Sequence, residues 1–279
     1  MNGEKFLLSA SFVKKLGELK RKINEVNATP HEVSNRKKYY ILLDVETVGV
    51  ADRSCYDISW VVMDRLGEIL KVRAFAVREV FNDMQVMNQA YYFNKFPKYL
   101  ELLSHGIYKI RNLNTIIKQL NKDIQDFNVS IFTAYNSNFD VSSLGYTIEK
   151  YNATPINYGK AKRECLWEQA VNSLMNTYSY RKFARENSLF TASRKYWSST
   201  AESCYMYMKK NLNLGEEHIG LYDVLFHEAE ILKTCNRKHI AKVNTEPSSS
   251  TWRKMKITDE EMAIINSNSN NENESAVAL

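Results

Sequence analysis

Two acidic residues, Asp44 and Glu46, follow a short apolar run and are separated by one residue. On a strand, side chains two positions apart lie on the same face, so the two carboxylates would lie side by side. Such a pair repels itself unless cations compensate, and its oxygens are suitable ligands for Mg²⁺. A D-x-E pair also occurs by chance at solvated strand ends. Here, however, Ile41, Leu42 and Leu43 run straight into the pair and place it at the carboxyl edge of a buried strand, where ligand sites gather in α/β sheets.

A third carboxylate, Asp140, ends the segment 134–140 (AYNSNFD), which follows an apolar run and opens a helical pattern. We expect Asp140 in the first turns of that helix, close to the same sheet edge. An Asp at this place is also explained by the helix dipole alone. Its neighbour Phe139 either packs in the core or presents its ring to a base, and core packing is the simpler interpretation.

His218 and Asp223 form a third candidate element, five positions apart. On an ideal helix this spacing separates two side chains by roughly 140°, so they would not face one point. We therefore predict that His218 lies on a loop before the helix and that Asp223 lies one turn inside it. Gly220 between them would permit a close approach. Without partners, a histidine here would be an ordinary loop residue.

The elements that must position these residues follow from short β-rich runs and from helical periodicity. Strands are predicted at 39–45, 57–64, 69–80 and 129–134, and helices at 84–103, 113–127, 138–151 and 218–234. The first three strands read as an antiparallel meander, and 155–215 as mostly helical. This order predicts an α/β fold with a mixed sheet flanked by helices.

The two ends of the chain differ from its middle. Residues 5–27 predict a basic amphipathic helix and 28–37 a polar linker, so that 1–37 precede a main domain at 38–240. The helix either packs on that domain or serves as a nucleic-acid-facing arm, and its apolar stripe favours packing. Residues 241–279 predict a polar tail that is disordered in part, above all in the stretch SNSNNENES.

Composition restricts the class of protein. The chain has 279 residues, of which 44% are hydrophobic, enough for a sizeable core, and its net charge of +6 permits an anionic partner without requiring one. Four cysteines without a C-x-x-C pair predict free thiols in a reducing cytoplasm. Neither a signal peptide nor a run of about 20 apolar residues is found, so we expect an intracellular protein without a membrane segment. Abundant Asn, Lys and Tyr are compatible with an AT-rich genome such as a viral one.

The three elements together resemble the exonuclease motifs of the DnaQ-like, DEDDh family of 3′→5′ exonucleases. The motifs appear as Asp44-Val45-Glu46-Thr47, as Asn136 to Asp140, and as His218 to Asp223. The stretch from DVETVG to YDISWVVMDRLGEIL is also similar to the family's first hairpin, and the resemblance covers 38–234. The sequence departs from the family pattern at Tyr135 (often His), Gly220 (usually Ala) and Val48 (usually Thr), and the segment 155–215 shows no resemblance.

This resemblance implies an RNase H-like fold and hydrolysis supported by two Mg²⁺ or Mn²⁺ ions. By analogy, Asp44 would bridge the two cations, Glu46 and Asp223 would lie on the side of the attacking water, and Asp140 would support the second cation. His218 would be the general base. Neighbouring carboxylates would raise its pKa. The other histidines have no motif context, and we expect His227 on the surface of its helix.

The resemblance implies that the substrate is a nucleic-acid 3′ end and that it is contacted by Thr47, Asn136 and Phe139. Basic and aromatic residues alternate between 158 and 211, a pattern that fits either single-strand binding or a helical face with core aromatics. The leading hypothesis is release of nucleoside monophosphates from single-stranded DNA or frayed 3′ ends, alone or beside a separate polymerase or replication protein. The alternatives are an RNA-trimming or oligoribonucleotide exonuclease and a non-catalytic nucleic-acid-binding module.

Overall fold

A six-stranded mixed sheet forms the centre of the protein in the computed structural model, which describes residues 10–237 and 245–265. The strand order is β4-β3-β2-β1-β5-β6. The strands are β1 (Tyr39–Thr47), β2 (Cys55–Asp64), β3 (Ile69–Val77), β4 (Lys109–Arg111), β5 (Ile131–Ala134) and β6 (Lys162–Cys165). β2 runs antiparallel to β1 and β3, and every other neighbouring pair is parallel. The predicted α/β class, with a mixed sheet flanked by helices, is confirmed.

The first three strands form the predicted meander. All residues of β2 are buried, which agrees with its almost continuous apolar sequence and with helices on both of its faces. The turn between β2 and β3 contains Gly67 with φ of 91°, a left-handed conformation that glycine adopts without steric cost. Asp64 Oδ1 accepts hydrogen bonds from the backbone N–H groups of Leu66 and Glu68 and so fixes this turn.

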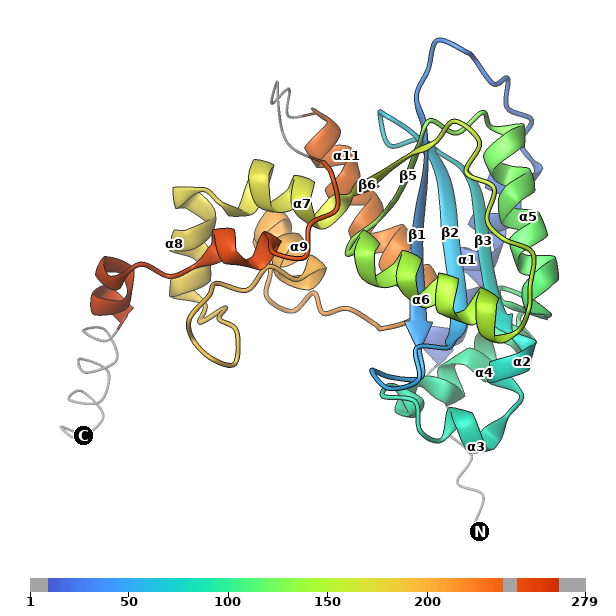
Figure 1. Cartoon of the computed structure of the whole chain (residues 1–279), viewed down its shortest axis with the longest axis horizontal. Helices are drawn as coiled ribbons and strands as arrows, with labels where there is room; N and C mark the ends of the chain where they lie inside the picture. The colour runs from blue at the N-terminus through green and yellow to red at the C-terminus, as the bar shows by residue number, and fades with distance from the viewer. Residues whose placement is uncertain (1–9, 238–244, 266–279) are drawn as a thin grey trace.

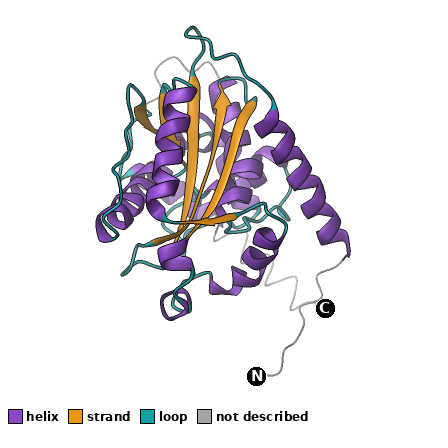
Figure 2. Ribbon diagram, turned by 90° about the vertical axis from the view of Figure 1, so that its right-hand side faces the viewer, coloured by secondary structure: helices purple, strands orange, loops and turns teal. Residues whose placement is uncertain are grey.

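Helices cover both faces of the sheet (Figure 2). They are α1 (Ala10–Ala28), α2 (Arg78–Phe81), α3 (Met84–Met87), α4 (Phe96–Ser104), α5 (Leu113–Asp126), α6 (Ser137–Lys150), α7 (Leu166–Ala170), α8 (Tyr178–Glu186), α9 (Ala201–Lys209), α10 (Gly220–Tyr222) and α11 (Ala229–Arg237). Two π-helical segments are η2 (Val171–Met175) and η3 (Asp223–Glu228), and two 3₁₀ turns are η1 (Phe93–Lys95) and η4 (Thr251–Met255). α5 and α6 cover one face, α1 and α11 lie on the other, and α7, α8 and α9 form a helical lobe beyond β6 (Figure 1).

Two edge strands and one helix boundary differ from the prediction. β4 and β6 consist mainly of charged residues, and β6 lies in a segment predicted to be helical. An edge strand pairs through its backbone and needs little apolar surface, so neither strand has an apolar pattern in the sequence. The helix predicted at 84–103 is instead divided into α3, η1 and α4. Asp83 caps α3 by accepting from the backbone N–H groups of Gln85 and Val86.

The N-terminal helix packs against β3, as its apolar stripe predicts. Leu16 and Leu19 are buried. The side chain of Asn27 accepts from the backbone N–H of Val72 at 3.0 Å and donates to its carbonyl at 3.1 Å. These two bonds satisfy a backbone segment of β3 that β4 does not reach, so α1 closes this edge of the sheet.

Part of the predicted tail packs on the helical lobe. Trp197 N donates to the carbonyl of Met255 at 2.9 Å, and Arg181 Nη1 lies 3.0 Å from Glu261 Oε2. Residues 245–265 are therefore part of the lobe. Residues 1–9, 238–244 and 266–279 lie outside the described residues, and the stretch predicted to be disordered is among them.

A buried polar network joins α5 to the sheet. Asp123 on α5 accepts from Trp60 Nε1 on β2 at 3.1 Å, from Arg73 Nε on β3 at 3.0 Å and from Gln119 Nε2 at 2.9 Å. The carboxylate is almost fully buried, so removing it would leave these donors without an acceptor in a dry environment.

We expect Asp123→Ala to lower the free energy of unfolding by about 3 kcal/mol, the scale for breaking a buried ion pair from one side. Asp126→Ala on the same helix is the matched control. Asp126 pairs with Lys122 at an exposed position, so its loss should cost less than about 1 kcal/mol. Urea unfolding of both variants measures the difference, and equal costs would contradict this role for Asp123.

Candidate active site

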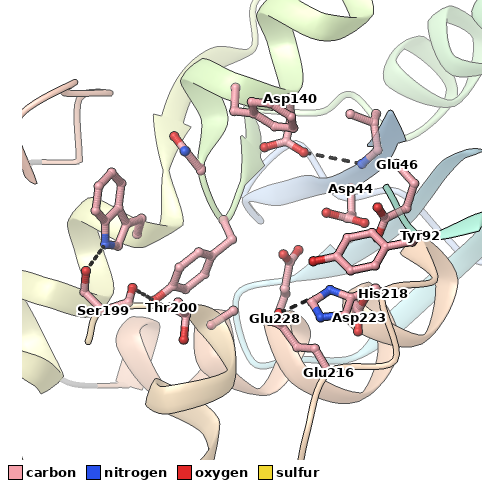
Figure 3. Close-up of a pocket in the computed structure, with 16 residues that line it drawn as sticks. Asp44, Glu46, Tyr92, Asp140, Ser199, Thr200, Glu216, His218, Asp223 and Glu228 are labelled. Atoms are coloured by element: carbon pink, nitrogen blue, oxygen red, sulfur yellow. Dashed lines mark hydrogen bonds and ion pairs between the residues drawn. The ribbon is translucent and has the colours of Figure 1, made fainter. Parts of the chain in front are cut away.

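The residues chosen by motif converge on one cavity of about 350 Å³ (Figure 3). Six carboxylates line it: Asp44, Glu46, Asp140, Glu216, Asp223 and Glu228. His218 lines it as well, as do Asn136 and Phe139. Thr47, expected to meet the substrate, is buried and does not line the cavity. The structure thus brings together seven of the eight residues predicted for the site, all except Thr47.

β1 and α6 position the first three carboxylates. Alternation along β1 leaves Asp44 and Glu46 partly exposed to the cavity while Val45 between them is buried. Asp140 lies in the first turns of α6, as predicted. Its Oδ1 accepts from the backbone N–H of Val45 at 3.3 Å. This bond joins the start of α6 to the end of β1 and sets Asp140 beside the β1 pair.

A loop and the start of the last helix position His218 and Asp223. His218 precedes α10 with φ of 51°, a left-handed conformation that is uncommon but enriched for histidine. Asp223 lies inside the helix, and its two oxygens accept from the backbone N–H groups of Glu217 at 3.2 Å and Ile219 at 3.0 Å. His218 therefore lies on the loop and Asp223 lies inside the helix, as predicted.

The ring of Tyr92 stacks on that of His218, with centroids 4.1 Å apart and an interplanar angle of 9°. Tyr92 lies just before η1, far from every motif in the sequence, and nothing in its local sequence indicates a place in the site. The stacking limits rotation of the imidazole, so the ring keeps one orientation at the edge of the cavity.

Gly220 approaches two carboxylates so closely that a side chain here would require its neighbours to shift. A Cβ at this position would lie 3.0 Å from Asp44 Oδ2 and 3.2 Å from Asp57 Oδ2. The backbone N–H of Gly220 donates to Asp57 Oδ2 at 3.0 Å. This contact gives a physical reason for glycine where the resembling family usually has alanine.

Asp57 is a buried carboxylate below the site that the sequence analysis did not single out. It accepts from the hydroxyls of Tyr99 and Tyr108, each at 2.7 Å, and the Tyr108 hydroxyl accepts from the backbone N–H of Leu221 at 3.0 Å. Asp57 thus anchors the start of α10 to the sheet. Its signal in the sequence is an acidic residue inside an otherwise apolar strand.

Burial raises the pKa of most carboxylates in the cavity. Burial is the largest cause for each, followed by Glu228 for Asp44 and by Asp223 for Glu46, and both of these pKa values lie well above the ordinary range. The pKa of Asp140 is raised to about 7 by burial, and that of Glu216 to about 8 by burial and Asp223. Neighbouring negative charges resist ionisation of one another, so bound cations would favour the ionised forms.

Two expectations about histidines are wrong. The pKa of His218 is lowered, not raised, because its partial burial outweighs the opposite effect of Asp223. His227, expected on the helix surface, is buried. Its Nδ1 lies 3.3 Å from Asp223 Oδ1, and its ring packs edge-on against Tyr205. Both outcomes depend on packing that the local sequence does not reveal.

The helical lobe forms the far wall of the cavity through Trp167, Ser199, Thr200 and Ala201. Trp167 Nε1 donates to Ser199 Oγ at 3.0 Å, and the Tyr135 hydroxyl donates to the Ser199 carbonyl at 2.8 Å. Tyr180 and Trp197 instead have structural roles, because they are buried within the lobe. Trp167 is the aromatic residue of 155–215 that faces the candidate site.

The fold and the cavity define a mixed α/β protein with a carboxylate-rich cavity at the carboxyl end of its central strand. No protein-family model and no curated protein matches the chain. Similar solved structures include Escherichia coli exonuclease I with a 5cy-dT13 oligonucleotide (12% identity, TM-score 0.49, 73% of this chain and 41% of that chain) and with a dA16 oligonucleotide (12%, 0.44, 72% and 41%). The chain therefore spans less than half the length of these exonuclease I chains.

No helix among the described residues is long and apolar enough to cross a membrane.

The raised carboxylate pKa values predict how stability depends on pH. A carboxyl group whose pKa is higher in the folded state stabilises the fold when protonated, and this contribution is lost as pH rises through the folded pKa. The pKa in the folded state is about 7 for Asp140 and about 8 for Glu216. In EDTA we expect the melting temperature to fall between about pH 6 and about pH 8.5, and to fall less with saturating Mg²⁺. A melting temperature in EDTA that rises over this range would contradict the raised pKa values.

The close approach at Gly220 predicts opposite effects for two glycine substitutions. Gly220→Ala should destabilise the protein by about 1–3 kcal/mol, because its Cβ would press on two carboxylates. Gly145→Ala on α6 is the control. Nothing lies within 4 Å of a Cβ there, so the better helix former should stabilise by about 0.5–1 kcal/mol. Chemical denaturation measures both, and a neutral Gly220→Ala would show that the approach is not tight.

Proposed function

We propose that this chain is a metal-dependent 3′→5′ exonuclease that releases nucleoside monophosphates from single-stranded DNA or frayed 3′ ends. One observation carries the proposal. The four motif carboxylates Asp44, Glu46, Asp140 and Asp223 come from three separate segments and line one cavity together with His218. Packing alone gives no reason to gather so much negative charge at one point, whereas phosphodiester hydrolysis with divalent cations does.

The residues of the cavity fit two divalent cations such as Mg²⁺ or Mn²⁺. The acidic side chains of the cavity offer carboxylate oxygens, which are the ligands that hard cations prefer. Ligand atoms of Glu46, His218 and Asp223 lie within 4.8 Å of one another. Asp44, Glu46, Asp140 and Asp223 would hold the ions. When bound, the ions would stabilise charge on the attacking and leaving oxygens of the phosphodiester.

His218 is proposed as the general base. A base must be unprotonated to accept a proton, and the lowered pKa of His218 keeps its imidazole neutral near pH 7. Stacking on Tyr92 fixes the ring, and Nδ1 lies 4.0 Å from Glu216 Oε2. An imidazole nitrogen would take the proton of the attacking water, and the surrounding carboxylates would stabilise the imidazolium that results.

Aromatic groups at the cavity support a single-stranded substrate. Phe139 is 40% exposed, which is unusual for phenylalanine inside a folded domain. It lines the cavity, as does Trp167 of the helical lobe. Rings of this kind stack on unpaired bases, and Asn136, which also lines the cavity, offers hydrogen-bond donors and acceptors to the terminal nucleotide.

Activity tests use 3′-labelled single-stranded DNA and RNA of the same sequence with Mg²⁺. Asp44→Asn and Asp223→Ala should reduce hydrolysis to background, because each removes a cation ligand. His218→Ala should lower the rate by about 10²–10⁴-fold and leave Mn²⁺ affinity unchanged, because general bases contribute on this scale and His218 is not assigned to coordination.

Asp126→Asn, on α5 and outside the cavity, is the control and should be fully active. DNA cleavage faster than RNA cleavage supports the proposed substrate, and the reverse would favour an RNA-trimming enzyme. Loss of Mn²⁺ binding in His218→Ala would make the histidine a ligand. Wild-type protein that binds both nucleic acids and cleaves neither would indicate a non-catalytic module.

A further inference from the structure

Glu228 lies in the cavity although it belongs to none of the three motifs. It ends η3, five residues after Asp223, and only 3% of its surface is exposed. Figure 3 shows its carboxylate directed into the cavity toward Asp44 and Asp140. Its Oε2 has no hydrogen-bond donor among the residues that the structure describes. A buried carboxylate oxygen without a donor is rare in folded proteins and requires an explanation.

The π-helical form of η3 accounts for this placement. On an α-helix, residues five apart point about 140° away from one another, so Asp223 and Glu228 would face different directions. In a π-helix the backbone pairs residue i with residue i+5, and such turns are frequent at functional sites. The wider turn from Asp223 to Glu228 lets both side chains line the same cavity.

The charges around Glu228 identify its closest electrostatic partners. Among charged neighbours, Glu228 has the largest effect on the pKa of Asp44, and Asp140 has the largest effect on the pKa of Glu228. The direction of the Glu228 carboxylate in Figure 3 agrees with these effects and places it on the side of the cavity formed by Asp44 and Asp140. Glu46, His218 and Asp223 form the group of ligand atoms within 4.8 Å.

An ionised carboxylate in this position is costly without a positive partner. The penalty for burying one ion is several kcal/mol even after relaxation, and five other carboxylates line the same cavity. Among residues 10–237 and 245–265, no Lys or Arg lines it. A divalent cation would supply the missing charge and would also occupy the lone pairs of the unpartnered oxygen.

We propose that Glu228 is a fifth carboxylate ligand and holds the divalent cation on the Asp44–Asp140 side of the cavity. This inference rests on the proposed function. Glu228 would hold this cation together with Asp44 and Asp140 and would be a ligand that the motifs do not include. Glu46 and Asp223 would hold the other cation.

Calorimetric titration of the full chain with Mn²⁺ tests the assignment. Wild-type protein should bind two ions. Glu228→Gln, which keeps the shape and removes the charge, should bind one ion as wild type does and the other at least about tenfold more weakly, the minimum expected for a group that supports a metal. Glu228→Met, which keeps the volume and removes both oxygens, should give the same loss.

The control is Glu230→Gln, two residues further on. Glu230 pairs with Lys233 at the surface and does not line the cavity, so its variant should bind both ions normally. A second readout is stability in EDTA. Both Glu228 variants should melt at a higher temperature than wild type, because they remove one of six mutually repelling carboxylates.

Three results would overturn the inference. Wild-type affinity for both ions in the two Glu228 variants would show that Glu228 is not a ligand and would leave the proposed function intact. Variants that melt below wild type in EDTA, or that do not fold, would show that the carboxyl group stabilises the fold through protein contacts. Wild-type protein that binds no Mn²⁺ would overturn both this inference and the proposed function.

Discussion

Six carboxylates share one cavity of about 350 Å³, and the rest of the structure holds them there against their mutual repulsion. Backbone N–H groups supply part of the compensation. Val45 donates to Asp140, and Glu217 and Ile219 donate to Asp223. These neutral donors stabilise single oxygens but do not cancel the charge. The remaining repulsion between the carboxylates destabilises the folded state. The buried sheet and the helices on its two faces supply the stability that offsets this repulsion.

Rigid elements set the distances in the cavity. β1 lies between β2 and β5 in the sheet, so its carboxyl end cannot move independently of the core. Asp57 on β2 binds the start of α10 through Gly220 and through the Tyr108 hydroxyl. One buried carboxylate on β2, the neighbour of the strand that carries Asp44, thus holds the short helix α10 that leads directly to Asp223. The absence of a side chain at Gly220 permits this close approach.

The helical lobe contributes to the cavity without carrying a motif. Its aromatic residues divide into two groups with different surroundings. Tyr180 and Trp197 are buried in the lobe, and Arg181 binds Glu261 of the C-terminal segment, so these residues stabilise the lobe. Trp167 faces the cavity and is held by Ser199. The sequence left core packing and base stacking open for these aromatic residues. Core packing therefore holds for Tyr180 and Trp197, and not for Trp167.

The sequence by itself determined the meander, the α/β class and the places of the five motif residues. Apolar runs and alternation are local properties, and they are enough to place Asp44 and Glu46 on one face of a strand. The five-residue spacing was likewise enough to separate His218 on its loop from Asp223 in its helix.

Only the tertiary structure decided the charged edge strands β4 and β6, the stacking of Tyr92 on His218 and the place of Glu228 in the cavity. It also reversed two expectations, the direction of the pKa shift of His218 and the exposure of His227. The physical reason is common to all of these. Edge pairing, burial and a π-helical turn depend on contacts between segments far apart in the chain. A pattern within one segment therefore cannot predict them.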